Sequence, residues 1–440
     1  MNRRDFIKLL ALSGLAVGCL PVITRKGYAA GAGGTNQFLV TIGADGGWDT
    51  TSLFDPKGQA KGVNNVDLDD TLVTPNGIRW SAVPGSVGSD IQARVADQYQ
   101  KFFTTYDDQL TIIRGLNAMT VSHSVGSRLK LSGSAGNYPS LSALYGAAYG
   151  SGLPLAYLTF GSAYGGADYT AELDVTKALL GDGSLIDQMA DPALGQDDAV
   201  YQMIIQKHLA RLERQIMKEN SAGGFPLYAK KMEQLLAERL QVNMFLPLQQ
   251  NLNSLNSGNG FNPDWYSDRA ASLKLQARIT AASFATGTSC CASLTWPGFD
   301  THYNNDRQFS QMGDLVEGIH TLMEALKFFG IEEQTTVVVA SDIGRAGKYN
   351  ADGGKDHGTT TGMMVLHPKS SGLGGRVFGE TSDSYGEQPI NFVTGKHDSN
   401  GTRLNVLHMM AALREHLGLM GTDVVSDFDL GDVPIPSVFS

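Results

Sequence analysis

The chain has 440 residues, of which 42% are hydrophobic and 18% are charged, with 52 glycines and 15 prolines. This composition excludes disordered, collagen-like and coiled-coil proteins, which need low apolar content, strict glycine periodicity or charge-dense heptads. Three cysteines exclude a disulfide scaffold and a Cys-rich zinc module. The net charge of −10 argues against a nucleic-acid partner, because phosphate binding needs a basic surface.

The first predicted element is an export signal over residues 1–30. A charged start precedes an apolar stretch at 9–23, and small residues follow at the end of the segment. The adjacent pair Arg3 and Arg4 resembles the twin-arginine signal of bacteria. Two alternatives remain: the segment is a membrane anchor or buried helix, or Cys19 is a lipidated N-terminus, because residues 15–19 resemble a lipobox.

Export by this route implies a transient partner, the twin-arginine translocase, and a periplasmic or secreted location for the mature protein. Removing the five basic residues and the one acidic residue of the signal leaves 29 basic and 43 acidic residues, a net charge of −14. No other stretch is long and apolar enough to span a membrane. We therefore expect an acidic mature chain without a transmembrane segment.

Apolar runs bounded by turn residues predict buried parallel strands along the chain. They are residues 38–42, 110–113, 292–295, 336–339 and 362–366. Apolar residues at helical spacing predict a helix over 309–329 and another near the end, over about 404–417. Residues 137–195 resemble loops, and a charged helical pair is expected at 206–218 and 227–242. We therefore expect residues 31–440 to form one α/β domain with a loop-rich and helical insertion at about 137–260.

Three acidic residues, Asp45, Asp300 and Asp342, each come just after one of these strands. In an open parallel sheet, ligands bind at the carboxyl ends of the strands, so these side chains could converge. His302 follows Asp300 by two residues, and His357 lies in the loop after Asp342. Carboxylate and imidazole groups together are ligands of Zn, Mn or Mg. A single Asp after a strand is commonly a turn or helix-cap residue, so the prediction depends on all five.

A further segment, Ser122-His123-Ser124, follows the strand at 110–113 and opens a predicted helix. A hydroxyl at a helix N-terminus meets free backbone N–H groups, which favours binding of an anion. Beside a divalent metal the same hydroxyl could ionise and act as a nucleophile. The alternative is a cluster of capping serines without chemistry. His123 could be a base, a metal ligand or a loop histidine.

These motifs resemble one group of bacterial proteins exported by the twin-arginine route. The group is domain-of-unknown-function family fifteen-zero-one, within the alkaline phosphatase and sulfatase superfamily. The resemblance extends over about residues 36–435. It is carried by Gly43-Ala44-Asp45-Gly46, Ser122-His123, Asp300-Thr301-His302, Ser341-Asp342-Ile343-Gly344-Arg345, Asp356-His357-Gly358 and Gly374-Gly375-Arg376-Val377-Phe378-Gly379.

The resemblance implies an alkaline phosphatase-like three-layer fold with a mostly parallel central sheet. In this superfamily an Asp after the first strand binds metal, which corresponds to Asp45. A Ser or Thr nucleophile opens a helix, which implies Ser124 or, second, Ser122. Later Asp and His residues complete one or two metal sites. In this chain they are Asp300, His302, Asp342 and His357.

The sequence departs from the superfamily pattern at three places. The first later pair is spaced Asp-x-His, in Asp300 and His302, where the superfamily has Asp-x-x-x-His. Asp342 is followed by Ile-Gly-Arg and not by His, so we expect an altered or missing second metal site, with Arg345 as an anion clamp. Gly126 stands where formylglycine sulfatases have Pro or Ala, which argues against that class.

The sequence thus predicts an exported metal-dependent hydrolase or transferase. Its substrate would be a small-molecule or polymer ester of phosphate or sulfate, and its cofactor a divalent metal, Zn, Mn or Mg. The alternative is a non-catalytic periplasmic or surface binding protein that uses the same fold.

Overall fold

A computed structural model describes residues 37–59, 62–151, 153, 155–164, 173, 177–179, 245–256 and 260–440. The predicted export signal, with Cys19, and the predicted helical pair at 206–218 and 227–242 lie outside the described residues. None of the helices in the described ranges is both long and apolar enough to cross a membrane.

The centre of the fold is an eight-stranded sheet with the strand order β12-β4-β11-β8-β1-β7-β5-β6. Its strands are β1 (Phe38–Asp45), β4 (Leu110–Asn117), β5 (Tyr157–Thr159), β6 (Lys177–Leu179), β7 (Cys291–Pro297), β8 (Thr335–Ala340), β11 (Thr360–Leu366) and β12 (Arg376–Phe378). Within the described part of the chain, seven of them run in one direction and β11 runs antiparallel to both of its neighbours, β4 and β8. The prediction of a mostly parallel α/β sheet is confirmed.

The predicted direction of one strand is wrong. The run at 362–366 was expected to be parallel, but in β11 Met363 pairs with Ala340 of β8 in antiparallel register. A parallel pair needs a crossover that returns the chain to the opposite edge of the sheet. Residues 341–359 make no such crossover and form a small hairpin of β9 (Gly344–Arg345) and β10 (His357–Gly358). Because every residue of β11 is buried, its apolar pattern is the same in either direction.

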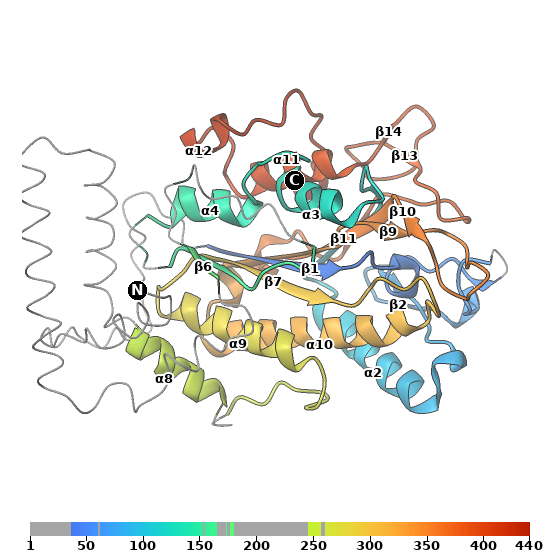
Figure 1. Cartoon of the computed structure of the whole chain (residues 1–440), viewed down its shortest axis with the longest axis horizontal. Helices are drawn as coiled ribbons and strands as arrows, with labels where there is room; N and C mark the ends of the chain where they lie inside the picture. The colour runs from blue at the N-terminus through green and yellow to red at the C-terminus, as the bar shows by residue number, and fades with distance from the viewer. Residues whose placement is uncertain are drawn as a thin grey trace, which may run out of the picture.

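Helices cover both faces of the sheet and complete three layers (Figure 1). One layer contains α2 (Ser89–Tyr106), α8 (Phe245–Asn256), α9 (Ala271–Ala285) and α10 (Arg307–Phe328). The other contains α3 (His123–Ser132), α4 (Leu141–Tyr149), α11 (Val406–His416) and α12 (Asp423–Ser426). Alternate residues of β1 enter the two cores: Leu39 packs in the layer of α4 and α11, and Val40 in the layer of α9 and α10.

The helices expected at 309–329 and near the chain end are α10 and α11. Two elements inside the range expected to be an insertion, β5 and β6, belong to the central sheet, and α4 belongs to a helical layer. The short elements are η1 (Thr50–Ser52), η3 (Leu68–Asp70), β2 (Leu72–Val73), β3 (Arg79–Trp80), η4 (Gly85–Val87), η7 (Glu332–Gln334), η8 (Lys369–Ser371), β13 (Pro389–Ile390), β14 (Thr402–Arg403) and η9 (Ser437–Phe439).

The antiparallel direction of β11 decides which loops meet. The chain leaves β1, β4, β7 and β8 at one edge of the sheet, and it enters β11 at the same edge. The seven residues of β11 span about 23 Å, so a parallel β11 would have begun that far from this edge. The loop that precedes β11 therefore lies beside the loops that follow the parallel strands.

Candidate metal centre

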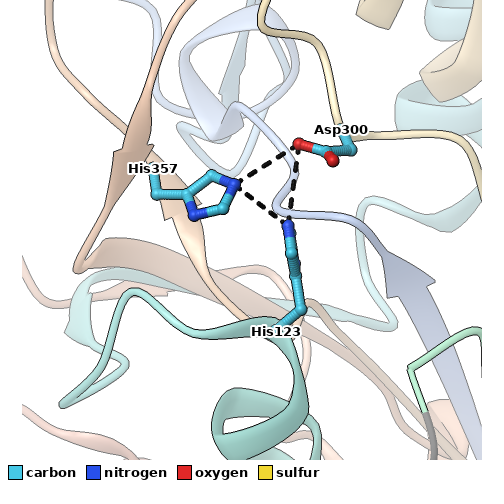
Figure 2. Close-up of side chains that lie close together, drawn as sticks. All are labelled: His123, Asp300 and His357. Atoms are coloured by element: carbon cyan, nitrogen blue, oxygen red, sulfur yellow. Dashed lines mark hydrogen bonds and ion pairs between the residues drawn. The ribbon is translucent and has the colours of Figure 1, made fainter.

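Three side chains from distant parts of the sequence converge at the edge of the sheet where β1, β4, β7 and β8 end (Figure 2). They are His123, the first residue of α3; Asp300, in the loop after β7; and His357, in β10. His123 Nε2 lies 3.0 Å from His357 Nε2, and Asp300 Oδ1 lies 3.6 Å and 3.4 Å from these two atoms. Ligands about 2.0–2.1 Å from a tetrahedral zinc ion are separated by about 3.4 Å. The spacing of the three atoms therefore fits a metal ion bound between them.

The other ring nitrogen of each triad histidine is held by an acceptor. His357 Nδ1 donates to the Val121 carbonyl oxygen at 2.8 Å, and His123 Nδ1 donates to Asp342 Oδ2 at 2.6 Å. With hydrogen on Nδ1, each Nε2 carries a lone pair. Two such lone pairs and a carboxylate oxygen then face one another, which is unfavourable unless a cation lies between them. Metal-binding histidines in proteins are held in this way.

His302 supplies a further candidate metal ligand beside the triad. Its Nε2 lies 3.0 Å from His357 Nε2 and 3.2 Å from Asp300 Oδ1, and its Nδ1 lies 3.4 Å from Asp356 Oδ1. The loop that carries it is packed against the loop before β10, since a Cβ atom on Gly354 would lie 1.9 Å from the His302 carbonyl oxygen. Only glycine permits this approach, so the sequence Gly353-Gly354 before Asp356 serves to bring the two loops together.

The protonation states also suit a metal. Burial alone would raise the pKa of Asp300, but the hydrogen bond and charge of Arg345 outweigh it, and the pKa lies below its usual value. Burial and the charge of Arg345 lower the pKa of His357. Asp300 is therefore a carboxylate and His357 a neutral imidazole at neutral pH, which are the forms that bind metal.

Asp342 positions the triad from behind. Its Oδ1 accepts hydrogen bonds from the backbone N–H groups of Gly46 and Gly47, both at 2.9 Å, and its Oδ2 accepts one from His123. Burial acts to raise the pKa of Asp342, but the hydrogen bond from His123, the charge of Lys130 and the Gly46 N–H hold it well below its usual value. The structure thus places Asp342 next to His123 and not in the triad itself.

Asp45 is engaged by other protein groups. Its Oδ1 accepts a hydrogen bond from Lys130 Nζ, and its Oδ2 accepts bonds from Thr295 Oγ1 at 2.9 Å and from the Ala163 N–H at 3.1 Å. The Asp45 and Lys130 side chains are only 1% and 5% exposed. Sequence reasoning missed Lys130, although it lies seven residues after His123 and so on the same face of α3, two turns further along.

Arg345 is fully buried and contacts the triad through Asp300. Its Nη2 donates to Asp300 Oδ1 at 2.6 Å and to the Gly46 carbonyl, while Nε and Nη1 donate to the carbonyls of Gly47 and Lys355. Its hydrogen bonds therefore connect the turn after β1 with the loop before β10 and orient Asp300. In this arrangement the guanidinium has no exposed surface with which to bind an anion.

The two candidate nucleophiles lie on either side of His123. Ser122 precedes α3 and Ser124 is its second residue, and both are exposed. Their hydroxyl oxygens are 3.3 Å apart. His123, between them, is the residue of this segment that enters the triad. The hydroxyls lie at the helix N-terminus next to it.

Tyr164 is a second residue that sequence reasoning missed. Its ring stacks on the His123 ring, with centroids 4.2 Å apart and an interplanar angle of 11°. Burial raises its pKa, with a further contribution from the charge of Asp300. The Gly- and Ser-rich segment that carries it gave no signal beyond an expected loop. Tyr164 covers one face of the imidazole and holds the plane of the ring.

Comparison with known proteins gives one family and several distant structures. A family model described as "Protein of unknown function (DUF1501)" matches residues 37–420. No curated protein matches the sequence.

Three of the similar solved structures have low sequence identity to this chain. Ps i-CgsB is 12% identical over 92% of this chain and 76% of that chain, with a TM-score of 0.37. The phosphonate monoester hydrolase of Agrobacterium radiobacter is 12% identical over 87% and 74%, with a TM-score of 0.30. A TAB5 alkaline phosphatase mutant with Mg bound is 12% identical over 79% and 95%, with a TM-score of 0.32. At these TM-scores the functional conclusion depends on the geometry of the site.

Proposed function

Because this chain belongs to DUF1501, a family described only as a protein of unknown function, we propose its function from its site. The protein is a divalent-metal-dependent hydrolase or transferase that acts on phosphate or sulfate esters. The single observation that carries this proposal is the convergence of His123 Nε2, His357 Nε2 and Asp300 Oδ1 within 3.0–3.6 Å.

His123, Asp300 and His357 would hold the metal, with His302 as a further ligand. Two or three imidazole nitrogens and one carboxylate oxygen favour Zn or Mn over Mg, which prefers oxygen ligands. A divalent metal here would polarise an ester oxygen and stabilise the negative charge that develops on the transferred group. The triad alone would leave one position of a tetrahedral site open, as catalytic metal sites require, and with His302 bound as well a substrate oxygen would enter as a fifth ligand.

The chain's own groups supply the remaining chemistry. The first backbone N–H groups of α3 have no partner within the helix and lie beside Ser122 and Ser124, where they would bind the oxygens of a phosphate or sulfate. Ser124, next to His123 and exposed, is the proposed nucleophile, with Ser122 as the second choice. Asp342 holds His123 in the ligand tautomer, and Arg345 orients Asp300. The superfamily resemblance supports the choice of phosphate or sulfate esters.

The test of the metal site uses the purified chain. Metal content is measured by elemental analysis, and turnover is measured with an aryl phosphate and an aryl sulfate. We expect bound divalent metal in the wild type and loss of both metal and turnover in His357→Ala. His397→Ala is the matched control, because His397 is an exposed loop histidine whose Nδ1 donates to the Pro389 carbonyl. A wild type without metal, or a His357→Ala variant with unchanged metal, would refute the proposal.

The nucleophile is tested separately from the metal. Ser124→Ala should keep the metal and lose turnover by a factor on the order of 10³ or more. Full turnover in the double variant Ser122→Ala/Ser124→Ala would exclude both hydroxyls. A chain that binds metal and turns over neither ester would fit the alternative, a non-catalytic binding protein.

The location is part of the same proposal. The Arg3-Arg4 motif supports export by the twin-arginine translocase to the periplasm or medium. Replacing both arginines with lysine should retain the protein in the cytoplasm, as measured by cell fractionation. Palmitate labelling of the membrane fraction would instead support a lipid anchor at Cys19.

A further inference from the structure

A buried lysine lies among the carboxylates at the strand ends. Lys130 reaches from the inner face of α3 to Asp45, and its side chain is 5% exposed. The superfamily resemblance assigns Asp45 to a metal, but each of its carboxylate oxygens already accepts hydrogen bonds from protein groups: Oδ1 from Lys130 and Oδ2 from Thr295 and the Ala163 N–H. Both Asp45 oxygens are thus engaged by protein donors, one of them a full positive charge, and neither oxygen is among the atoms that converge at the triad.

The surroundings of the Lys130 ammonium are tightly packed. A Cβ atom added to Gly43 would lie 2.8 Å from Asp45 Oδ1 and 2.9 Å from Lys130 Nζ. A metal ion could therefore reach Asp45 only if the ammonium moved away.

The charges of the two buried carboxylates, Asp45 and Asp342, also favour an ammonium group at this position. Asp45 and Asp342 are both about 1% exposed, and two buried carboxylates without a counter-charge are strongly unfavourable. Lys130 supplies that positive charge to Asp45 directly, and its field also stabilises the Asp342 carboxylate. In two-metal enzymes this neutralisation is supplied by a second cation.

We propose that the Lys130 ammonium takes the place of a second metal ion, so that the protein binds one divalent ion per chain, at the His123–Asp300–His357 triad. The inference rests on the proposed function for the existence of that first metal. Lys130 and Asp45 then form an internal ion pair in the place of a second metal site.

The test is metal stoichiometry on the full chain, independent of any substrate. The protein is equilibrated with excess Mn²⁺ or Zn²⁺, desalted, and analysed for metal per chain. The wild type should hold one ion. Lys130→Ser, which removes the ammonium and opens its space, should hold a second and weaker ion. Adding Asp45→Asn to that variant should return the content to one.

A second variant covers the case in which Lys130→Ser fails to fold. Lys130→Met/Asp45→Asn removes both charges and keeps nearly the same volume, and it should still hold one ion. Loss of the metal in this variant would make Asp45 a ligand and overturn the inference. Two ions in the wild type, or one ion in a folded Lys130→Ser variant, would also overturn it. Two ions in the wild type would leave the proposed function intact, whereas no ion at all would remove that function as well.

Discussion

Replacement of Asp342 by asparagine should weaken metal binding without touching the triad. The two acceptor roles of Asp342 differ: Oδ1 receives the Gly46 and Gly47 N–H groups at 2.9 Å, and Oδ2 receives His123 Nδ1 at 2.6 Å. In Asp342→Asn the amide oxygen must stay on the glycine side, because the amide NH₂ would otherwise face two N–H donors. The NH₂ group then faces His123 Nδ1.

That arrangement changes the tautomer of the ligand. An amide NH₂ donates, so His123 Nδ1 must accept, and the ring hydrogen moves to Nε2. A protonated Nε2 has no lone pair for the metal. Loss of the group that holds a metal-binding histidine typically lowers affinity by about 10- to 100-fold, or about 1.4–2.7 kcal/mol, and we expect the upper end here.

The assay is competition for Zn²⁺ or Mn²⁺ with a fluorescent chelator near pH 7.5, and ¹⁵N NMR of the imidazole reports the tautomer. Ser341→Ala is the matched control, because Ser341 Oγ donates to Asp342 Oδ1 at 3.1 Å and does not contact His123. We expect this control to stay within about threefold of the wild type. Asp342→Asn with wild-type affinity would refute the ligand role of His123.

Two further predictions concern stability. Burial lowers the pKa of His320 from 6.5 to about 4, so the unfolded chain binds a proton at a higher pH than the folded chain does. The full free energy of unfolding is therefore present above pH 6.5, and it decreases by about 3 kcal/mol as the pH falls to 4. Urea unfolding of His320→Gln should show a correspondingly shallower decrease over this range, and equal slopes would contradict the assignment. Gly126→Ala places a Cβ atom 2.1 Å from the Asp342 carbonyl oxygen, so α3 must shift. It should lose about 1–3 kcal/mol of unfolding free energy and bind metal more weakly, whereas Gly85→Ala, with 4.0 Å of clearance, should do neither.

The central strands could be predicted because they are buried on both faces. Residues 38–42, 292–295 and 336–339 are continuous apolar runs, and the structure has β1, β7 and β8 there. The direction of β11 could not be predicted, because it is set by the connection at 341–359 and leaves no trace in the apolar pattern of the strand. This direction is also why His357 reaches the site.

Only part of the candidate site follows from strand-end positions. Strand-end positions predict that Asp300, His302 and His357 lie at one edge of the sheet, and the structure places them together. Strand-end positions do not distinguish a carboxylate that faces a metal from one that faces Lys130, because this depends on how α3 is rotated about its axis. The helix rotation is fixed by packing, with Gly126 against the Asp342 carbonyl, and single-residue motifs do not contain that information.

The uneven exposure of the triad affects how a metal ion would be loaded. The His123 side chain is 13% exposed and is anchored in a helix by Asp342, while Asp300 and His302 are 38% and 40% exposed on the loop side. We therefore expect an ion at the triad to enter and leave past Asp300 and His302 while α3 and the sheet stay folded. Occupancy would then follow the free metal concentration of the surroundings, and a chelator should strip the site from intact protein.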